Sequence, residues 1–364
     1  MDVRLALLAI TLVPRLGPAT AGRLIQHFGS VEALLDSDEE ARSAVTGVSA
    51  KTAREMGRSV YLDQAVEMKA AAEKVGLDLF TLADSDYPKR LRDIYDPPLV
   101  LWGRGHTLDW TMPTVSIVGM RAASSYGLWA AEHFARRLAE RGILVVSGMA
   151  RGIDTAAHRG AVEGGGRTVA VLGTGADVVY PPENAKLYKA ISRQGVVLSE
   201  FAPGTPPMPG HFPRRNRIIS GLAQGTLVIE AGEKSGALIT AYMALDQGRD
   251  VFALPGDVRS MKSRGTHRLI QQGAKLVGSL EDILQEIFDL KSSALPPSPV
   301  IFEPHNLSPV ETDIWAALSE RPVHIDLLAQ QCNRSPSEVM AVLLGMELKN
   351  WVMQQPGMLF KRRL

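Results

Sequence analysis

Residues 114–158 read TVSIVGMRAASSYGLWAAEHFARRLAERGILVVSGMARGIDTAAH, and their pattern indicates the fold class. It contains two short and nearly continuous apolar runs, Val115–Val118 and Leu144–Ser147, and a helix-length segment follows each run. Such runs are typical of strands that are covered on both faces of a parallel sheet. Each run ends in glycine and polar residues, where the chain turns into the next helix. The stretch therefore predicts consecutive β-α units.

Five further runs continue this pattern toward the carboxyl end, again with helix-length segments between them: Thr168–Leu172, Val196–Ser199, Thr226–Ile229, Val251–Leu254 and Lys275–Val277. Strands that alternate with helices predict an α/β fold, here a Rossmann-like doubly wound sheet that is mainly parallel. We assign residues 84–290 to this domain. Asp84–Pro98 is expected to be the connector that leads into it.

The segment before this domain is expected to be helical. Residues 1–83 contain short apolar helices and two Gly-centred turns, Pro14–Pro18 and Thr46–Ser49, which predict a helix-hairpin-helix or SAM-like domain. Such turns can hold a phosphate at a helix N-terminus. Residues 1–85, however, carry nine Lys+Arg against twelve Asp+Glu. This balance favours a bundle that serves packing or partner contacts.

The segment after the domain is expected to be a linker and a third domain. Residues 291–307 are rich in proline and serine, which is the composition of a linker. Residues 308–364 contain three helical patterns, followed by the β-prone runs Trp351–Met353 and Met358–Phe360, and predict a winged helix. Its expected recognition helix, Ser335–Leu348, has no Lys or Arg, whereas a protein that reads a DNA groove needs phosphate-neutralising charge. We expect a protein-contact role or weak DNA binding.

Composition excludes several classes of protein. The chain of 364 residues is 45% apolar and 22% charged, as in ordinary globular proteins. It has no apolar run of membrane-spanning length and no signal-peptide pattern at its start, so we expect a cytoplasmic protein that does not enter the membrane. Its single cysteine, Cys332, cannot form an internal disulfide, and no Cys/His cluster predicts a metal site. No dinucleotide or P-loop motif is present, so no cofactor is expected.

Positive charge is concentrated in the middle domain, although the net charge of the whole chain is only +1. Residues 114–290 hold twenty Lys+Arg against sixteen Asp+Glu, and the excess lies in two segments that we interpret as loops, His211–Arg217 and Asp257–Arg268. The middle domain is therefore expected to attract anions.

Three polar turns are expected to meet at one edge of the sheet. Ligands of doubly wound sheets bind outside the carboxyl ends of the strands. A single Gly-Ser turn is ordinary loop chemistry, but three turns at one edge favour an anion site, because glycine and helix N-termini offer backbone amides. The candidate residues in these turns are Arg121, Ser147, Gly148, Met149, Ala150, Arg151, Ser235, Gly236 and Thr240.

An aromatic residue adjoins a basic cluster between these turns, in His211–Arg217. Phe212 can stack on a base, and guanidinium groups can hold phosphates in bidentate fashion. This combination suits single-stranded nucleic acid, and its candidate residues are Phe212, Arg214, Arg215, Asn216 and Arg217.

One pair of residues could suggest catalysis. Asp154 and His158 lie four residues apart and share a helix face. No Ser or Cys nucleophile in a recognisable setting accompanies them. We interpret Asp154 as a brace of its helix and His158 as a packing residue, and we expect no catalytic residues.

The chain from Tyr87 to Val277 resembles the DNA-processing protein A (DprA/Smf) family. The matching segments include VGMR (118–121), SGMARGIDTAAH (147–158), GTGADVVYP (173–181), FPRRNRIISGL (212–222), EAGEKSGALIT (230–240) and LIQQGAKLV (269–277). The resemblance implies a protein that binds single-stranded DNA in natural transformation, protects it and helps to load the recombinase RecA. It also implies binding without catalysis, and a homodimer formed through the last part of the Rossmann-like domain. The residues that it places at the DNA are Arg121, Ser147, Gly148, Phe212, Arg215, Asn216, Arg217, Ser235 and Gly236.

Two departures from the family pattern affect the expected charge. Some relatives carry lysines where this chain has Pro182 and Pro209. Affinity is then lower, or Arg214 and the Arg259–Arg268 segment supply the missing charge. On this reading, Arg121→Ala and Arg217→Ala should both weaken binding to single strands.

Two other functions remain open at this point. The same helix N-termini could hold a nucleoside monophosphate in an enzyme of the phosphoribohydrolase type, which has a related Rossmann-like fold. Alternatively, the winged helix could be the primary module of a transcription regulator.

Overall fold

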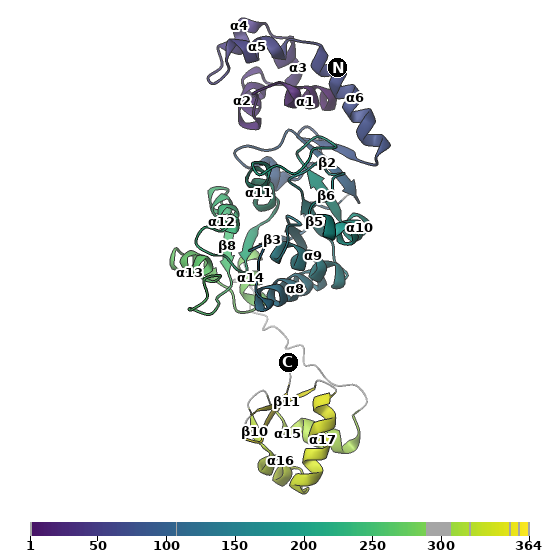
Figure 1. Ribbon diagram of the computed structural model, residues 1–364, viewed down its shortest axis with the longest axis vertical. Coiled ribbons are helices and arrows are strands. Elements are labelled where there is room, and N and C mark those ends of the chain that lie inside the picture. The colour runs from purple at the N-terminus through teal and green to yellow at the C-terminus, as the bar shows by residue number, and fades with distance from the viewer. Residues whose placement is uncertain are drawn as a thin grey trace. The chain divides into compact units, whose positions relative to one another are not determined.

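The computed structural model describes residues 2–106, 108–288, 307–319, 322–348, 351–355 and 357–362. Its contacts divide the chain into two compact units, Met1–Ser293 and Ala294–Leu364. In Figure 1 the first unit runs from purple to green and the second is yellow-green to yellow.

A nine-stranded sheet forms the centre of the first unit. Its strands are β1 Asp78–Thr81, β2 Val100–Gly105, β3 Thr114–Val118, β4 Leu144–Ser147, β5 Thr168–Val171, β6 Val196–Ser199, β7 Gly225–Val228, β8 Asp250–Ala253 and β9 Lys275–Leu276. Their order is β1-β2-β6-β5-β4-β3-β7-β8-β9. From β6 to β9 all neighbours in this order pair in parallel. The order reverses between β3 and β7, which is the topological switch point of a doubly wound sheet. The predicted mainly parallel α/β fold is confirmed.

The edge strands β1 and β2 were not predicted. They pair antiparallel with each other, with Leu79 opposite Trp102, and β2 joins the parallel strands through β6. The sheet thus begins at Asp78, within the residues that the sequence analysis assigned to the helical domain. Asp84–Pro98 links the two strands and contains the short helix α7, Lys89–Arg92. An antiparallel edge strand leaves no β-α repeat in the sequence, and the pattern that revealed the other strands could not reveal these.

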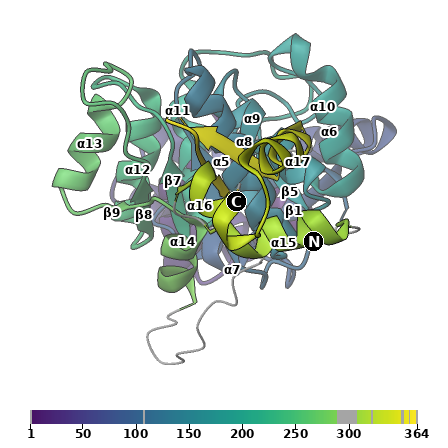
Figure 2. The same cartoon turned by 90° about the horizontal axis from the view of Figure 1, so that it is seen from below.

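Helices cover both faces of the sheet (Figure 1, Figure 2). Alternate residues of β3 face opposite ways: Val115 and Ile117 pack into one core and Val118 into the other. The helices on one face are α8 Ser125–Glu140, α9 Ile153–Glu163, α10 Ala185–Gln194 and α14 Leu280–Ile287; those on the other are α11 His211–Leu222, α12 Gly236–Asp246 and α13 Arg264–Gln271. Burial on both faces explains why the strands are almost wholly apolar.

A helical domain packs against the antiparallel edge of the sheet. Its helices are α1 Val3–Leu12, α2 Pro18–Phe28, α3 Val31–Asp36, α4 Glu39–Ser43, α5 Ala50–Met56 and α6 Val60–Lys74. Ser30 and Ser49 cap the starts of α3 and α5 with their side chains. Leu8 and Leu24 are buried in one core with Trp102 of β2. The predicted N-terminal helical domain is confirmed.

The described residues of the second unit form three helices and a three-stranded sheet of order β10-β12-β11. Its elements are α15 Pro309–Ala317, β10 Val323–His324, α16 Ile325–Gln331, α17 Pro336–Leu348, β11 Val352–Gln355 and β12 Leu359–Arg362. Ser308 and Glu311 form a capping box at the start of α15. The predicted winged helix is confirmed. Residues 291–306 of the expected linker lie outside the described residues.

No helix in the described part of the chain is both long and apolar enough to cross a membrane.

Candidate nucleic-acid cleft

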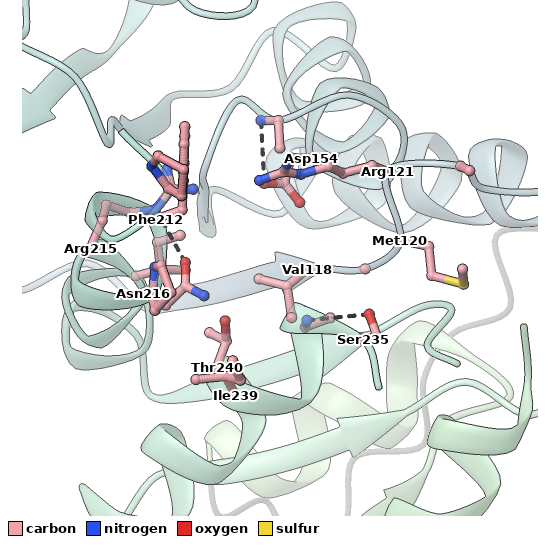
Figure 3. Close-up of a pocket in the computed structure, with 18 of the residues that line it drawn as sticks. Val118, Met120, Arg121, Asp154, Phe212, Arg215, Asn216, Ser235, Ile239 and Thr240 are labelled. Carbon is pink, nitrogen blue, oxygen red and sulfur yellow. Dashed lines mark hydrogen bonds between the residues drawn. The ribbon is translucent and has the colours of Figure 1, made fainter. Parts of the chain in front are cut away.

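A cleft of about 890 Å³ opens at the carboxyl edge of the sheet, beside the switch point between β3 and β7. The segments after these two strands, one face of α11 and the start of α12 form most of its wall, and Ala150, Asp154, Tyr180, Pro207 and Pro209 complete it. In Figure 3, Phe212, Arg215 and Asn216 come from one helix, and Arg121 and Asp154 lie across from them. The cleft lies where doubly wound sheets bind their ligands. The candidate residues that line it are Arg121, Ala150, Phe212, Arg215, Asn216, Ser235, Gly236 and Thr240.

The segment His211–Arg217 is the beginning of α11, not a loop as the sequence analysis had it. A helix turns about 100° per residue, so the side chains of this segment diverge. Phe212, Arg215 and Asn216 face the cleft, whereas Arg214 and Arg217 do not line it. The sequence signal for this helix is the run of apolar residues that follows, in which Ile218, Ile219 and Leu222 are buried.

Arg217 makes a structural ion pair instead of lining the cleft. Its side chain is only 5% exposed, and Nη2 lies 2.6 Å from a carboxylate oxygen of Glu200. Its Nε lies 2.8 Å from a carboxylate oxygen of Asp96. Burial opposes the charge of Arg217, but the two acids raise its pKa above the ordinary value. Arg214 pairs with the same Glu200 at 3.0 Å. Neither arginine is placed to meet a ligand in the cleft.

Arg215 is buried in the cleft floor and anchors the loop after β4. Its Nη1 donates to the carbonyl oxygen of Gly148 at 2.7 Å and to that of Val171. A Cβ atom at Gly148 would lie 2.5 Å from the Arg215 guanidinium, so a larger residue there would displace this group. Burial lowers the pKa of Arg215 to about 10, which leaves it charged at neutral pH. Arg215 therefore holds the loop in place and adds positive charge beneath the cleft.

The loop after β4 presents fewer groups to the cleft than the sequence analysis expected. Ser147 is buried, and its hydroxyl donates to the carbonyl oxygen of Ile117 at 2.6 Å. Met149 is buried as well, with a left-handed φ of 55°. Ala150 reaches the cleft, while Gly148 and Arg151 border a small hollow beside it. Arg151 is exposed and pairs with Glu183.

Phe212 supports a layer of flat groups at the cleft wall. Gly173 lies against its ring, since a Cβ atom there would come within 2.8 Å of the ring. The Arg121 guanidinium carbon lies 5.2 Å from the ring centroid, within the range of a cation–π contact. The ring of Tyr180 lies 5.6 Å from that of Phe212. Tyr180 was not predicted as a site residue; its signal in the sequence is an aromatic residue at the end of GTGADVVYP.

The start of α12 adds an anion-binding end to the cleft. Ser235 caps this helix, and its hydroxyl accepts from the Ala237 amide at 3.3 Å. Gly236 is exposed beside it, and Thr240 lies buried one turn further. The amides at a helix N-terminus and the helix dipole both favour negative charge. Lys234, which the sequence analysis missed, is exposed on the same wall; its signal is a cation directly before the capping serine.

Asp154 and His158 are both buried on α9. Asp154 lines the cleft floor, accepts weakly from the Ala150 amide at 3.4 Å, and has its pKa raised by burial to about 6. His158 does not line the cleft, and its Nδ1 lies 2.8 Å from the Thr168 hydroxyl. Burial lowers the pKa of His158 to about 3, so its ring is neutral. This geometry fits the interpretation of Asp154 as a residue that stabilises its helix and of His158 as a packing residue.

Two of the charges that were expected to compensate for the two prolines, Arg259 and Arg264, are paired with acids. Arg259 lies 2.9 Å from Asp257, and Arg264 lies 3.3 Å from Glu233. Pro209 itself lines the cleft, whereas Pro182 opens the 3-10 turn Pro182–Asn184. Among the residues that line the cleft, Arg121 and Lys234 are the exposed cations.

A doubly wound sheet with guanidinium groups, aromatic rings and a helix N-terminus at its switch point defines a Rossmann-like, anion-binding class of protein. A model of the family "DNA recombination-mediator protein A" matches residues 78–288. The chain belongs to this family, the DprA/Smf family, and the resemblance seen in the sequence is confirmed. The flanking domains match as well: a SAM-like helix-hairpin-helix tandem over residues 7–56 and a DprA winged helix domain over residues 296–358.

Individual relatives agree with the family match. The "Protein Smf" of Synechocystis is 34% identical over an alignment 391 positions long, which covers 98% of both chains. The DNA processing protein DprA of Streptococcus pneumoniae is 48% identical over 207 residues, 57% of this chain and 73% of the relative. An X-ray structure of that DprA covers 78% of this chain and 97% of its own, with a TM-score of 0.69 and 36% identity. DNA processing protein A of Helicobacter pylori, solved for its single-stranded DNA binding mode, gives a TM-score of 0.53 at 28% identity and covers 59% of this chain and 98% of its own.

Proposed function

We propose that this protein binds single-stranded DNA in the cleft and acts by binding, not by catalysis. The observation that carries the proposal is the contact between the Arg121 guanidinium and the Phe212 ring, in the same cleft as the capped start of α12. A flat cationic surface beside backbone amides suits a chain of alternating bases and phosphates. The relative from Helicobacter pylori, which is described by its single-stranded DNA binding mode, supports the same assignment.

Each part of the cleft has a separate task in this proposal. The amides at the start of α12 and the Lys234 ammonium bind phosphates, because both carry positive charge and face the cleft. A base stacks on the outer side of the Arg121 guanidinium, which Phe212 supports from below. Arg215 contributes charge from the buried floor. None of these groups is paired with an activated nucleophile, which favours binding over chemistry.

The proposal includes the two partners that the family resemblance implies, RecA and a second copy of the chain. The last part of the α/β domain has exposed apolar side chains at Tyr242, Leu245, Val258, Met261 and Leu276. Exposed apolar side chains of this kind suit a subunit interface. Sedimentation of the chain and of a Leu245→Glu variant tests the dimer: the variant should sediment as a monomer.

The function is tested by titrating the full chain against a fluorescent oligothymidylate and against a duplex of equal length. We expect preferential binding to the single strand, with an affinity that falls steeply as salt rises from 50 to 200 mM. Arg121→Ala should weaken this binding, and Arg159→Ala, at an exposed arginine that does not line the cleft, is the control. Binding that does not respond to salt, or no binding at all, contradicts the proposal.

The nucleotide-processing alternative is separated by calorimetry with mononucleotides, followed by an assay for the free base. Tight binding with turnover supports the enzyme. The burial of His158 and its contact with Thr168 argue against an acid–base pair with Asp154.

For the winged helix we propose a protein contact or weak DNA binding. Glu338 accepts from the Ser335 amide and hydroxyl at the start of α17, and Leu344 is exposed further along this helix. A fragment of residues 306–364 that prefers one duplex sequence would instead support a transcription regulator.

A further inference from the structure

Helix α8 carries a row of exposed aromatic side chains that the cleft does not use. Tyr126, Trp129 and His133 are spaced by three and four residues, so they lie on one face of the helix. Tyr126 and Trp129 are 47% and 58% exposed. Their ring centroids are 6.1 Å apart, and those of Trp129 and His133 are 5.1 Å apart. The ring planes within each pair differ by 30° and 17°, so the three rings form a nearly parallel series.

This aromatic face, defined as Tyr126, Trp129 and His133, begins at the rim of the cleft. Arg121 and Ala122 line the cleft, and α8 starts at Ser125, shortly after them. The Tyr126 hydroxyl donates to the carbonyl oxygen of Pro255, which follows β8 at the carboxyl edge of the sheet. In a β-α unit the helix runs back along the sheet. The aromatic face therefore leads from the cleft toward the opposite edge.

Basic side chains continue this face. Arg137 lies four residues after His133 and thus on the same side of the helix. It is 3.9 Å from Glu140, a loose pair that leaves its donors available. Arg136 is exposed on the flank, where it is paired with Glu132 and Glu163. Burial lowers the pKa of His133, and the nearby Arg137 and Arg136 lower it further. The ring is therefore neutral at pH 7 and can stack on a base without adding a charge.

We propose that the aromatic face binds the bases of the nucleotides that leave the cleft, so that the path of the single strand continues along α8. The inference rests on the proposed function of the cleft. Stacking on aromatic rings tolerates every base, and a neighbouring guanidinium group can hold the backbone. The exposed apolar side chains on the last part of the α/β domain, such as Leu245 and Val258, are in contrast mainly aliphatic and suit a protein partner better.

The length of the aromatic face and of its continuation to Arg137 predicts how many nucleotides the face can bind. From Tyr126 to Arg137 the helix rises about 16 Å. At about 3.4 Å per stacked nucleotide this corresponds to about five nucleotides. The affinity of the unchanged chain should therefore keep rising over about five nucleotides beyond the shortest oligothymidylate that it binds.

The experiment compares the unchanged full chain, Trp129→Ala and the control Leu128→Ala with oligothymidylates of increasing length. Leu128 is 39% exposed on the same helix but does not share the aromatic face. Trp129→Ala should bind the shortest oligomer normally and the longer ones about 5- to 150-fold more weakly, the range for the loss of one stacked base. Leu128→Ala should match the unchanged chain at every length. Trp129 is exposed, so its replacement should leave the fold intact, which thermal unfolding checks.

Three outcomes distinguish the two proposals. If the unchanged chain binds no oligomer, the proposed function fails. If it binds the shortest oligomer but Trp129→Ala matches it at every length, only the path along α8 is overturned. If Trp129→Ala changes the sedimentation of the protein and not its affinity for DNA, the aromatic face is a contact between copies of the chain, and the inference is likewise overturned.

Discussion

Replacing Asp154 by asparagine should stabilise the protein at neutral and alkaline pH. The Asp154 carboxyl group is 6% exposed, and burial raises its pKa from 3.8 to about 6. Asparagine has nearly the same shape, keeps an oxygen that can accept from the Ala150 amide, and carries no charge. Asp154→Asn therefore removes the cost of holding a charge in the cleft floor.

The size and sign of the effect follow from the pKa shift. A shift of about 2 units corresponds to about 3 kcal/mol between the charged and neutral forms. Because the pKa is higher in the folded state, the stabilisation from this group is complete below about pH 4 and is lost as the pH rises through 6. Asp154→Asn should thus equal the unchanged chain near pH 4 and exceed it by up to about 3 kcal/mol at pH 8.

His158 requires that the two proteins be compared at each pH. Burial lowers its pKa to about 3, so the unfolded chain binds a proton that the folded chain does not, and this group stabilises the fold as the pH rises from 3 to 6.5. This contribution opposes that of Asp154 but is common to both proteins. Urea unfolding at pH 4, 6 and 8, followed by circular dichroism, measures the difference. A variant less stable than the unchanged chain at pH 8 would refute the reasoning, since the attraction of Arg215 would then outweigh burial.

Four further outcomes are expected. Removal of the Asp154 charge should also raise the affinity for oligothymidylate at pH 8, as titrations of Asp154→Asn by fluorescence anisotropy will show; unchanged or weaker binding would contradict it. Lys234→Ala should reduce the slope of log affinity against log salt by roughly 0.7, the share of one single-strand phosphate, whereas Arg121→Lys should keep the slope and lose affinity through the lost contact with Phe212. Arg217→Ala should lower stability by about 3 kcal/mol in urea unfolding, because it removes a buried partner of Glu200; weaker DNA binding with unchanged stability would contradict this placement. Gly148→Ala should lower the thermal midpoint by displacing the Arg215 guanidinium, and a midpoint equal to that of the unchanged chain would argue against that contact.

The central sheet could be predicted from the sequence because each parallel strand is an apolar run buried on both faces. Val115–Val118 and Leu144–Ser147 correspond to β3 and β4 to within a residue. The polar turns after these strands had to meet at one edge, since parallel strands share a direction. The edge strands β1 and β2 could not be read in this way, because their pairing is antiparallel and depends on contacts with the helical domain.

The site could be predicted only in part, because helix rotation decides which arginines face the cleft. The segment from His211 to Arg217 contains three arginines, but only Arg215 faces the cleft, and it does so from below. Burial of Arg217 depends on Glu200 and Asp96, which are distant in sequence. Lys234 and Tyr180 line the cleft because of the conformation of their loops, and the sequence pattern does not predict that conformation.

Hydrogen exchange of the full chain with and without oligothymidylate tests most directly whether the switch-point cleft holds the DNA. The account predicts that bound DNA slows exchange at residues 119–125, 150–154, 209–217 and 232–240, which form the cleft wall. Slower exchange confined to the helical domain or to the winged helix, with these four segments unchanged, would contradict it.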